Sequence, residues 1–290
     1  MGSGRRAYRR KHIDKGAFQV SWLRDVFGKD KVIIGMAHLP PLPGTPLYDA
    51  ARGVEGIIER IHGDVEALQA GGIDAVMFCN ENDRPYTLKA GPETAATMAR
   101  VITEVRPALS VPFGVDVLWD PVAAIAIAHA TGGVFVREVF TGAYAGDIGI
   151  WNTNAGEALR FRRQIGAERV KLLYNINAEF AAPLAARGLQ QVAQTAVFSS
   201  LADGLCVSGM MTGSEVDTES LMAAKRSVRD VPVFANTGVT AENVQEKRRY
   251  ADGAIVGTHL KEGGITWNRV DPERVKRFMA AVRSVRGDAA

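Results

Sequence analysis

Residues 233–260 of the chain read VFANTGVTAENVQEKRRYADGAIVGTHL. Two apolar runs, at residues 233–239 and 253–260, flank a polar segment of helical character near residues 241–248. Short β-branched runs that alternate with helical segments are typical of parallel strands joined by helical crossovers. This stretch therefore predicts a strand–helix–strand unit.

The same alternation extends through the chain. Six further strands are predicted at residues 32–39, 74–80, 112–120, 135–140, 170–177 and 204–209, and further helices near residues 54–70, 92–107, 121–131, 155–165, 188–200, 217–229 and 271–285. Eight strands and eight helices are the count of a closed (β/α)8 TIM barrel, an α/β fold of about 250 residues. An open doubly wound sheet is the alternative. Its glycine-rich turn is absent, because the first strand runs into HLPPLPGTP at residues 38–46.

Composition places the chain among ordinary globular proteins, since 47% of its 290 residues are hydrophobic and 23% are charged. No stretch reaches the roughly 18 apolar residues of a membrane span, and the N-terminus lacks the apolar core of a secretory signal. Cys79 and Cys206 lie in apolar runs without a metal-type spacing, as reduced thiols do. We therefore expect a cytoplasmic protein without a cysteine-based zinc site.

The net charge of +3 is unevenly placed. Residues 1–15 contain six of the Lys and Arg residues against one acidic residue, so the remainder is slightly acidic. We assign residues 1–30 to a basic N-terminal tail with a leading helical segment, and residues 31–290 to a single barrel domain. A basic tail can contact anionic lipid or nucleic acid, but a solvated leader is the simpler interpretation. No nucleic-acid or membrane partner is predicted.

The loops after the last two strands carry the strongest functional signal. Gly238 and Gly257 end these strands and allow the backbone to approach a ligand closely. Thr240 or Ala241 is expected to open a helix whose free N–H groups favour an anion, and Thr258 adds a hydroxyl. Such loops bind phosphate in many barrels, and this pair resembles the phosphate site of the tryptophan-biosynthesis and ribulose-phosphate-binding barrels. Tight turns and a helix cap are the alternative interpretation.

A third loop of small and hydroxyl residues follows the sixth predicted strand. It contains Ser208, Thr212 and Gly213, which would complete the phosphate site. Alternatively, Ser214 and Asp217 simply start the next helix.

Several strands carry polar residues where apolar ones are expected. Strand alternation places Asp116 and Asp120 on the face opposite Phe113 and Val115, so both carboxylates are predicted to face the barrel interior. Arg137 and Glu138 must point in opposite directions. Buried charges need partners or a function. The candidates for one polar centre at the barrel mouth are Asp116, Glu138, Asn175, Asn177 and Asn236, and a purely structural polar layer is the alternative.

Two histidines end neighbouring strands of the predicted barrel, His38 the first and His259 the eighth. Imidazole titrates near neutral pH, so either is a candidate general acid or base. A structural, hydrogen-bonded histidine is the alternative for both.

The polar cluster at residues 80–84, which begins with Asn80, follows the second strand. Its oxygens suit a hard cation, but the spacing is not that of a calcium loop and also fits a plain turn. No cofactor is predicted with certainty, and a divalent metal is the only candidate.

The glycine-rich loop at residues 141–157 is expected to be mobile and to serve as a lid or a subunit contact.

Seven motifs occur in order along the chain: GMAHLPPLPGTP (35–46), GGIDAVMFCNEND (71–83), FGVDVLWD (113–120), VREVFTGAYAGDIGIW (136–151), NAGEALRFRRQIGA (154–167), NTGVTAENV (236–244) and ADGAIVGTHLKEGG (251–264). Together they resemble the BtpA/SgcQ family of barrel proteins over residues 31–283. The resemblance implies a predicted barrel enzyme. One branch of the family is named for photosystem I biogenesis and another is associated with carbohydrate-uptake genes.

Two hypotheses from different classes follow. The first is an enzyme, a lyase, isomerase or hydrolase, that acts on a small phosphorylated metabolite such as a sugar phosphate by acid–base or metal-assisted chemistry. The residues in each role are, for proton transfer, Asp116, Glu138 and His38; for substrate hydroxyls, Asn80, Asn175, Asn177, Ser208 and Asn236; and for phosphate, Thr212, Gly213, Gly238, Thr240, Gly257 and Thr258. A homo-oligomer is expected. The second hypothesis is a non-catalytic photosystem I assembly factor on a membrane surface.

Overall fold

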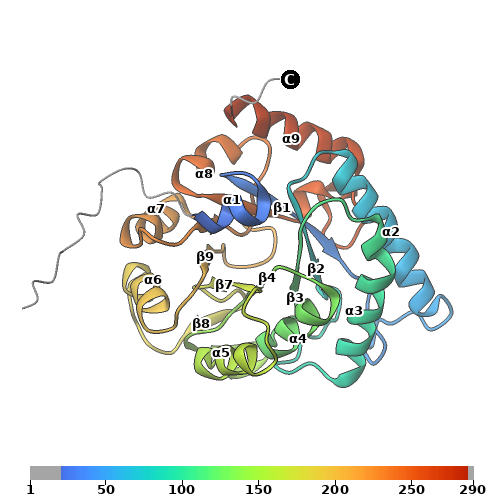
Figure 1. Ribbon diagram of the computed structural model, residues 1–290, viewed down its shortest axis with the longest axis horizontal. Helices are drawn as coiled ribbons and strands as arrows, with labels where there is room; N and C mark the ends of the chain where they lie inside the picture. Colours follow the sequence, from blue (N-terminus) through green and yellow to red (C-terminus); the bar gives the residue numbers. More distant parts are fainter. Residues whose placement is uncertain (1–20, 287–290) are drawn as a thin grey trace, which may run out of the picture.

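A computed structural model describes residues 21–286 of the chain. Eight parallel strands form a closed barrel in the order β1-β11-β10-β9-β7-β4-β3-β2 (Figure 1). Their bounds are Val32–His38 (β1), Ala75–Cys79 (β2), Phe113–Asp116 (β3), Phe135–Glu138 (β4), Lys171–Asn175 (β7), Gly204–Val207 (β9), Val233–Ala235 (β10) and Gly253–Val256 (β11). The predicted (β/α)8 barrel is confirmed. The basic segment 1–15 lies outside the described residues.

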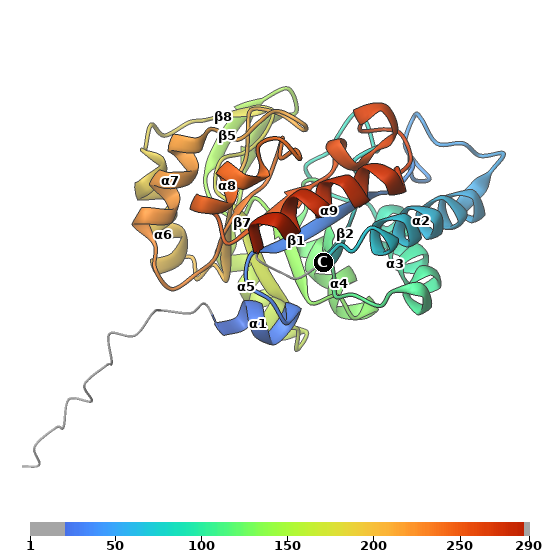
Figure 2. The same ribbon diagram turned by 90° about the horizontal axis from the view of Figure 1, so that it is seen from above.

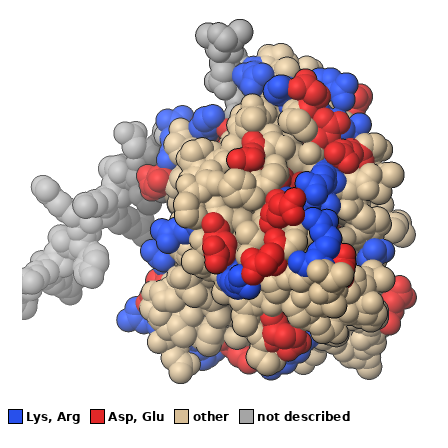
Figure 3. Space-filling view, turned by 90° about the vertical axis from the view of Figure 1, so that its right-hand side faces the viewer, with Lys and Arg blue, Asp and Glu red and all other residues tan. Residues whose placement is uncertain are grey.

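Helices surround the barrel. They are α2 (Gly53–Ala70), α3 (Pro92–Val105), α4 (Pro121–Thr131), α5 (Ala155–Gln164), α6 (Leu189–Phe198), α7 (Thr218–Ser227), α8 (Val244–Tyr250) and α9 (Pro272–Arg286), with short 3-10 turns η1 (Arg106–Ala108), η2 (Thr258–Leu260) and η3 (Glu262–Gly264). On the flank of α2 and α3, acidic and basic side chains lie next to one another (Figure 3), as in the pair of Arg100 with Glu55 at 2.6 Å. None of the helices between residues 21 and 286 has the length and apolar composition that crossing a bilayer requires.

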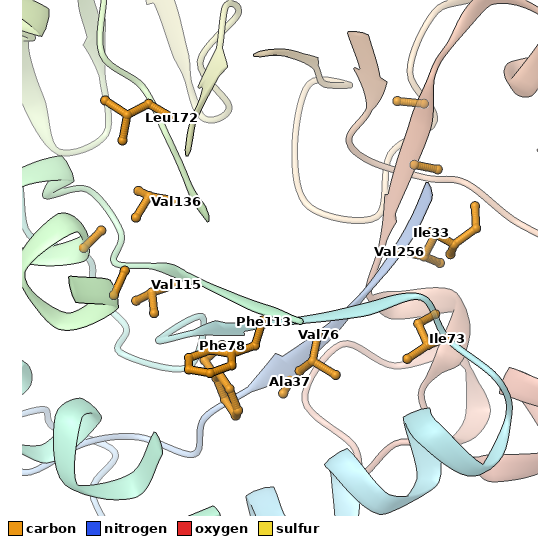
Figure 4. Packing of buried hydrophobic residues seen from close by; sticks show 14 of the residues in the cluster. Ile33, Ala37, Ile73, Val76, Phe78, Phe113, Val115, Val136, Leu172 and Val256 are labelled. Atoms are coloured by element: carbon orange, nitrogen blue, oxygen red, sulfur yellow. The ribbon is translucent and has the colours of Figure 1, made fainter. Parts of the chain in front are cut away.

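Strand alternation separates two apolar clusters. The outward set, which includes Val76, Val115 and Val136, packs against the helices (Figure 4). The inward set contains Ile34, Met77, Phe135, Leu173 and Phe234 and fills the barrel interior. This arrangement follows from the two-residue period of a strand. It places Gly114 and Asp116 inside the barrel, as the pattern of β3 predicts.

Several predicted element boundaries are wrong. Strands β10 and β11 end at Ala235 and Val256, before Gly238 and Gly257, and two further boundaries concern Asp120 and the start of α8. Strand β3 ends at Asp116, and Asp120 does not face the barrel interior. Its carboxylate instead accepts the N–H groups of Val122 and Ala123 and caps α4, a local bond that competes with strand extension. Helix α8 begins at Val244 rather than near residue 240, because residues 241–243 form a turn.

The loop after β4 was expected to be mobile, but it forms a hairpin of β5 (Ala143–Gly146) and β6 (Gly149–Asn152). Strand β5 also pairs with β8 (Ala181–Pro183), which follows β7, so the loops after β4 and β7 join in one small antiparallel sheet. Aromatic rings of this sheet pack on rings of the neighbouring loops. The ring centroids of Trp151 in β6 and Trp119 in the loop after β3 are 4.7 Å apart. These contacts pack the glycine-rich segment against the loop after β3.

The first helix, α1 (Ser21–Phe27), closes the end of the barrel at which the strands begin. Phe27 packs edge-to-face on Phe135 at the start of β4, with ring centroids 5.8 Å apart. Trp22 donates its indole N–H to the backbone oxygen of Asp203, just before β9. Figure 2 shows α1 opposite the β5–β8 sheet. Access to the barrel interior is therefore at the carboxyl ends of the strands.

Candidate functional site

A cavity of about 230 Å³ opens at the carboxyl ends of β1, β10 and β11. The lining includes nine residues that the sequence singled out: His38, Thr212, Gly213, Asn236, Gly238, Thr240, Gly257, Thr258 and His259. All six residues proposed for phosphate are among them. The strand-end glycines and hydroxyls thus meet in one place because the barrel brings the loops after β9, β10 and β11 side by side.

The two strand-end glycines are in crowded positions. Gly238 has a φ of +62°, and a Cβ there would lie 2.3 Å from the Cα of Glu215. A Cβ on Gly257 would lie 3.0 Å from the ring of His38. Within residues 21–286, the backbone N–H groups of Gly238, Val239 and Gly257 have no hydrogen-bond acceptor. This end of the cavity therefore offers free backbone donors, which suit an anion.

The helix expected to supply further N–H donors does not do so. Helix α8 has only seven residues and begins after the turn. The N–H of Thr240 is bonded to the side-chain oxygen of Asn243 at 2.8 Å, and that of Ala241 to Nε2 of His259 at 3.3 Å. Thr240 lines the cavity, but its backbone donor is already used.

A cation that sequence reasoning missed lies at the same end. Arg274, in the first turn of α9, lines the cavity and donates from Nε to the backbone oxygen of His259 at 2.7 Å. The bond leaves the terminal guanidinium nitrogens for other partners. Burial and the charge of Arg274 lower the pKa of His259. The only sequence signal for Arg274 is its place just after the start of the last helix.

Most hydroxyls of the cavity are engaged by the protein. The hydroxyl of Thr258 lies 2.8 Å from that of Thr266, and the hydroxyl of Thr237 accepts the N–H of Gly209 at 2.5 Å. Thr212 donates to Glu81 at 2.8 Å. The hydroxyls therefore hold the loops in place, and the free groups at this end are the backbone amides and Arg274.

The side of the cavity toward β2 and β7 contains two carboxylates. Glu81 belongs to the polar cluster 80–84, which the sequence suggests only as a cation site, and the sequence does not select Glu179. Glu81 follows β2 and Glu179 follows β7, and each is at most 4% exposed. Burial, and next the charge of Glu179, raise the pKa of Glu81 to about 7. Burial also raises the pKa of Glu179, although Arg137 opposes this shift. Both side chains line the cavity together with Arg137.

Behind these carboxylates, a buried network crosses the barrel interior. Arg137 bonds to Asp116 at 2.5 Å and lies 3.7 Å from Glu179. Glu179 accepts from the side-chain amides of Asn175 at 3.4 Å and Asn236 at 3.2 Å. Ser208 joins both asparagines through its hydroxyl. Asn175 and Ser208 thus support the lining residues without lining the cavity themselves.

The carboxylates proposed from the sequence for catalysis lie deeper. Asp116 is completely buried, and neither Asp116 nor Glu138 lines the cavity. Glu138 accepts the N–H of Val139, and burial, with Asp116 nearby, raises its pKa well above the usual value. Strand alternation explains this position, because Arg137 faces inward with Phe135 while Glu138 is on the face of Val136.

Two asparagines proposed for substrate hydroxyls have structural partners. Asn80 accepts the N–H of Leu118 at 2.8 Å and donates to Asp83 at 3.1 Å. Asn177 exchanges two hydrogen bonds with the backbone of Ser208. Neither lines the cavity. Among residues 21–286, no three His, Cys, Asp or Glu side chains are grouped so that they could hold a metal ion.

His38 lines the cavity in its neutral form. Its ring is 3% exposed, and burial, followed by the charge of Lys261, lowers its pKa well below the usual value. Nδ1 lies 3.5 Å from the backbone oxygen of Thr266, which only accepts hydrogen bonds, so we assign the ring proton to Nδ1. Nε2 is then an acceptor beside Gly257.

The raised pKa of Glu81 predicts a pH-dependent stability. A carboxyl that binds its proton more tightly in the folded state stabilises the fold at low pH, and this contribution disappears as the pH rises through about 7. As the pH rises from 5 to 8, the free energy of unfolding of Glu81→Gln, measured in urea, should therefore increase relative to that of the parent. His38 and His259, whose pKa values are lowered, act in the opposite sense but cancel in this comparison. Parallel pH curves for parent and variant would contradict the prediction, and the exposed Glu66→Gln is the control.

Comparisons with known proteins place these features in a family. The family model described as BtpA matches residues 29–284. The putative sgc region protein SgcQ of Escherichia coli is 47% identical over 92% of this chain and 100% of its own length. The photosystem I biogenesis protein BtpA of Synechocystis is 32% identical over 90% of this chain and 91% of its own.

Among solved structures, (S)-3-O-geranylgeranylglyceryl phosphate synthase from Thermoplasma acidophilum in complex with its substrate sn-glycerol-1-phosphate is similar in fold. The TM-score is 0.57 at 13% identity, over 92% of this chain and 98% of that one.

Proposed function

The chain belongs to the BtpA family, and we propose that it is an enzyme that binds a small phosphorylated metabolite, in particular a sugar phosphate. The observation that carries the proposal is the polarity of the cavity. One end offers unpaired backbone amides and Arg274, and the other offers carboxylates and an amide oxygen. A ligand that fits both ends has an anionic group at one end and hydrogen-bond donors at the other.

The free amides of Gly238, Val239 and Gly257 supply the anion end. Amides of this kind bind phosphate without a side-chain charge, and Arg274 adds the cation that balances it. Barrels commonly bind phosphate in the loops after their last two strands. The Thermoplasma synthase of similar fold holds a glycerol phosphate, which supports a phosphorylated ligand for this barrel too.

The opposite end suits hydroxyl groups. Oδ1 of Asn236 is buried and has no partner among the described residues, and Asn236 lines the cavity. Glu81 and Glu179 add further acceptors. An acceptor left without a donor in a buried site costs about 1–3 kcal/mol, and a ligand hydroxyl would remove this cost. A metabolite with hydroxyls beyond its phosphate matches this end better than one with a second carboxylate.

Phosphate binding gives the test of this function. Inorganic phosphate at ten times its Kd should raise the Tm by about 2–4 °C through preferential binding to the folded state. Gly257→Asp should abolish the shift, because the new carboxylate would enter the cavity beside His38. Gly188→Asp is the matched control, since it makes the same change at an exposed helix cap with open space around it. An unchanged Tm in the parent protein, or a full shift in Gly257→Asp, would reject the phosphate site.

A second candidate function rests on the Synechocystis relative, whose name assigns it to photosystem I biogenesis. For this chain, membrane association would depend on the basic segment 1–15, which lies outside the described residues. The polarised cavity has no role in that function. We therefore favour the enzyme.

A further inference from the structure

Glu81 and Glu179 line the same end of the cavity but have different hydrogen-bond donors. Glu81 accepts from two neutral hydroxyls through Oε1, those of Thr212 at 2.8 Å and Tyr86 at 3.2 Å. Oε1 of Glu179 accepts from two amides and lies 3.7 Å from the guanidinium of Arg137. A cation stabilises a carboxylate more than hydroxyls do. The two side chains are thus in unequal environments.

The charged and titratable groups around Glu81 favour its protonated form. Glu179 and Asp116 carry negative charge nearby, and Arg137, the cation closest to them, is bonded to Asp116. The remaining neighbours are Cys79, whose Sγ lies 3.8 Å from Oε2 of Glu81, and Tyr86. Burial raises the pKa of both, so both stay neutral. The raised pKa of Glu81 agrees with this environment.

We propose that Glu81 and Glu179 are a proton-transfer pair for the hydroxylated end of the ligand, in which Glu81 holds the proton and Glu179 the negative charge. Two carboxyl groups whose environments separate their protonation states are the usual arrangement for acid and base roles. The inference rests on the proposed function for the identity of the ligand. It assigns the chemistry to side chains that line the cavity rather than to the deeper Asp116 and Glu138.

The ligand class that this pair suits is a phosphorylated hydroxy-aldehyde or hydroxy-ketone. Glu179 removes a proton from the carbon next to the carbonyl, and the C–H electrons form the C=C bond of an enediol. At the same time, Glu81 donates its proton to the carbonyl oxygen and forms the O–H bond. Glu81 ends as the carboxylate and Glu179 as the acid, so atoms and charge balance without a co-reactant. Collapse of the enediol returns both protons, and the reaction class is proton-transfer isomerisation.

Solvent exchange tests the pair directly. The parent protein should incorporate deuterium from D₂O next to the carbonyl of at least one of dihydroxyacetone phosphate, D-ribulose 5-phosphate and D-fructose 6-phosphate, as followed by NMR. Glu81→Gln and Glu179→Gln should each slow the exchange by roughly 100-fold or more. Glu66→Gln, which removes an exposed carboxylate of α2, should leave it unchanged. No exchange with any of the three, or undiminished exchange in Glu81→Gln, overturns the proposal.

A second variant covers the case in which Glu81→Gln fails to fold. Thr212→Val removes the hydroxyl that stabilises the carboxylate of Glu81, so it should move the fall of the pH–rate profile, where Glu81 loses its proton, to higher pH. In ¹³C-labelled glutamate spectra, one carboxyl should titrate near pH 7 and move downward in Glu179→Gln. A structural role for Glu81 would not move the midpoint of the pH–rate profile, and an unmoved midpoint in that profile overturns the proposal. Phosphate binding without exchange would reject the pair and leave the proposed phosphate site standing.

Discussion

Arg137→Met should lower the free energy of unfolding by about 3–5 kcal/mol, because it leaves the completely buried Asp116 without its partner. Although burial disfavours the charge of Arg137, Asp116 and Glu179 raise its pKa, so the guanidinium is charged at every accessible pH. Methionine preserves much of the side-chain volume but supplies neither charge nor donors. Urea unfolding at pH 7 measures the loss.

Arg163→Met is the matched control for this experiment. Arg163 pairs with Glu168 on the surface, where the arginine side chain is 82% exposed. Exposed pairs contribute at most about 1 kcal/mol, because water screens them. A loss below about 1 kcal/mol in Arg137→Met, equal to that of the control, would mean that the buried network does not stabilise the barrel.

Gly238→Ala should destabilise the protein by about 2–5 kcal/mol for two separate reasons. A residue with a Cβ pays about 1–2 kcal/mol at a φ of +62°. The Cβ would also lie 2.3 Å from both the Cα and the backbone N of Glu215, so the loop after β9 must move, and overpacking of this kind costs about 1–3 kcal/mol. Thermal and urea unfolding measure the sum.

Gly166→Ala separates the two contributions. Gly166 has a φ of +70°, and nothing lies within 4 Å of an added Cβ. It therefore reports the backbone cost alone, and the excess in Gly238→Ala is the cost of the close approach. If both variants lose the same free energy, the contact with Glu215 is not a constraint on the loop.

The barrel could be predicted because its signals are local. In β3, apolar Phe113 and Val115 alternate with Gly114 and Asp116, and the same period recurs in the other strands. Proline and glycine mark the helix ends, as Pro121 and Gly132 do for α4. The strand-end glycines of β10 and β11 are visible for the same reason, and closure of the barrel brings them together.

The carboxylate end of the cavity could not be predicted, since Glu81 and Glu179 lie in loops without a periodic pattern. Glu81 stands in a polar run that resembles a turn, and only the barrel shows that its side chain, rather than that of Asn80, reaches the cavity. The sequence instead predicts a catalytic role for the strand residue Asp116, but its carboxylate forms a buried ion pair with Arg137. Sequence marks buried polar residues well, while only tertiary structure shows which of them face a ligand.

The strand pair β5–β8 has a consequence for how this barrel can diversify. Glu179 stands two residues before β8, and Arg137 is the penultimate residue of β4, after which the β5–β6 hairpin follows. Barrel enzymes commonly acquire new specificities by exchange of single loops. Here the two loops are joined by main-chain hydrogen bonds, so a graft of the loop after β4 alone would displace Glu179, and a graft of the loop after β7 alone would remove it. Recombination at this barrel mouth must transplant both segments as a unit.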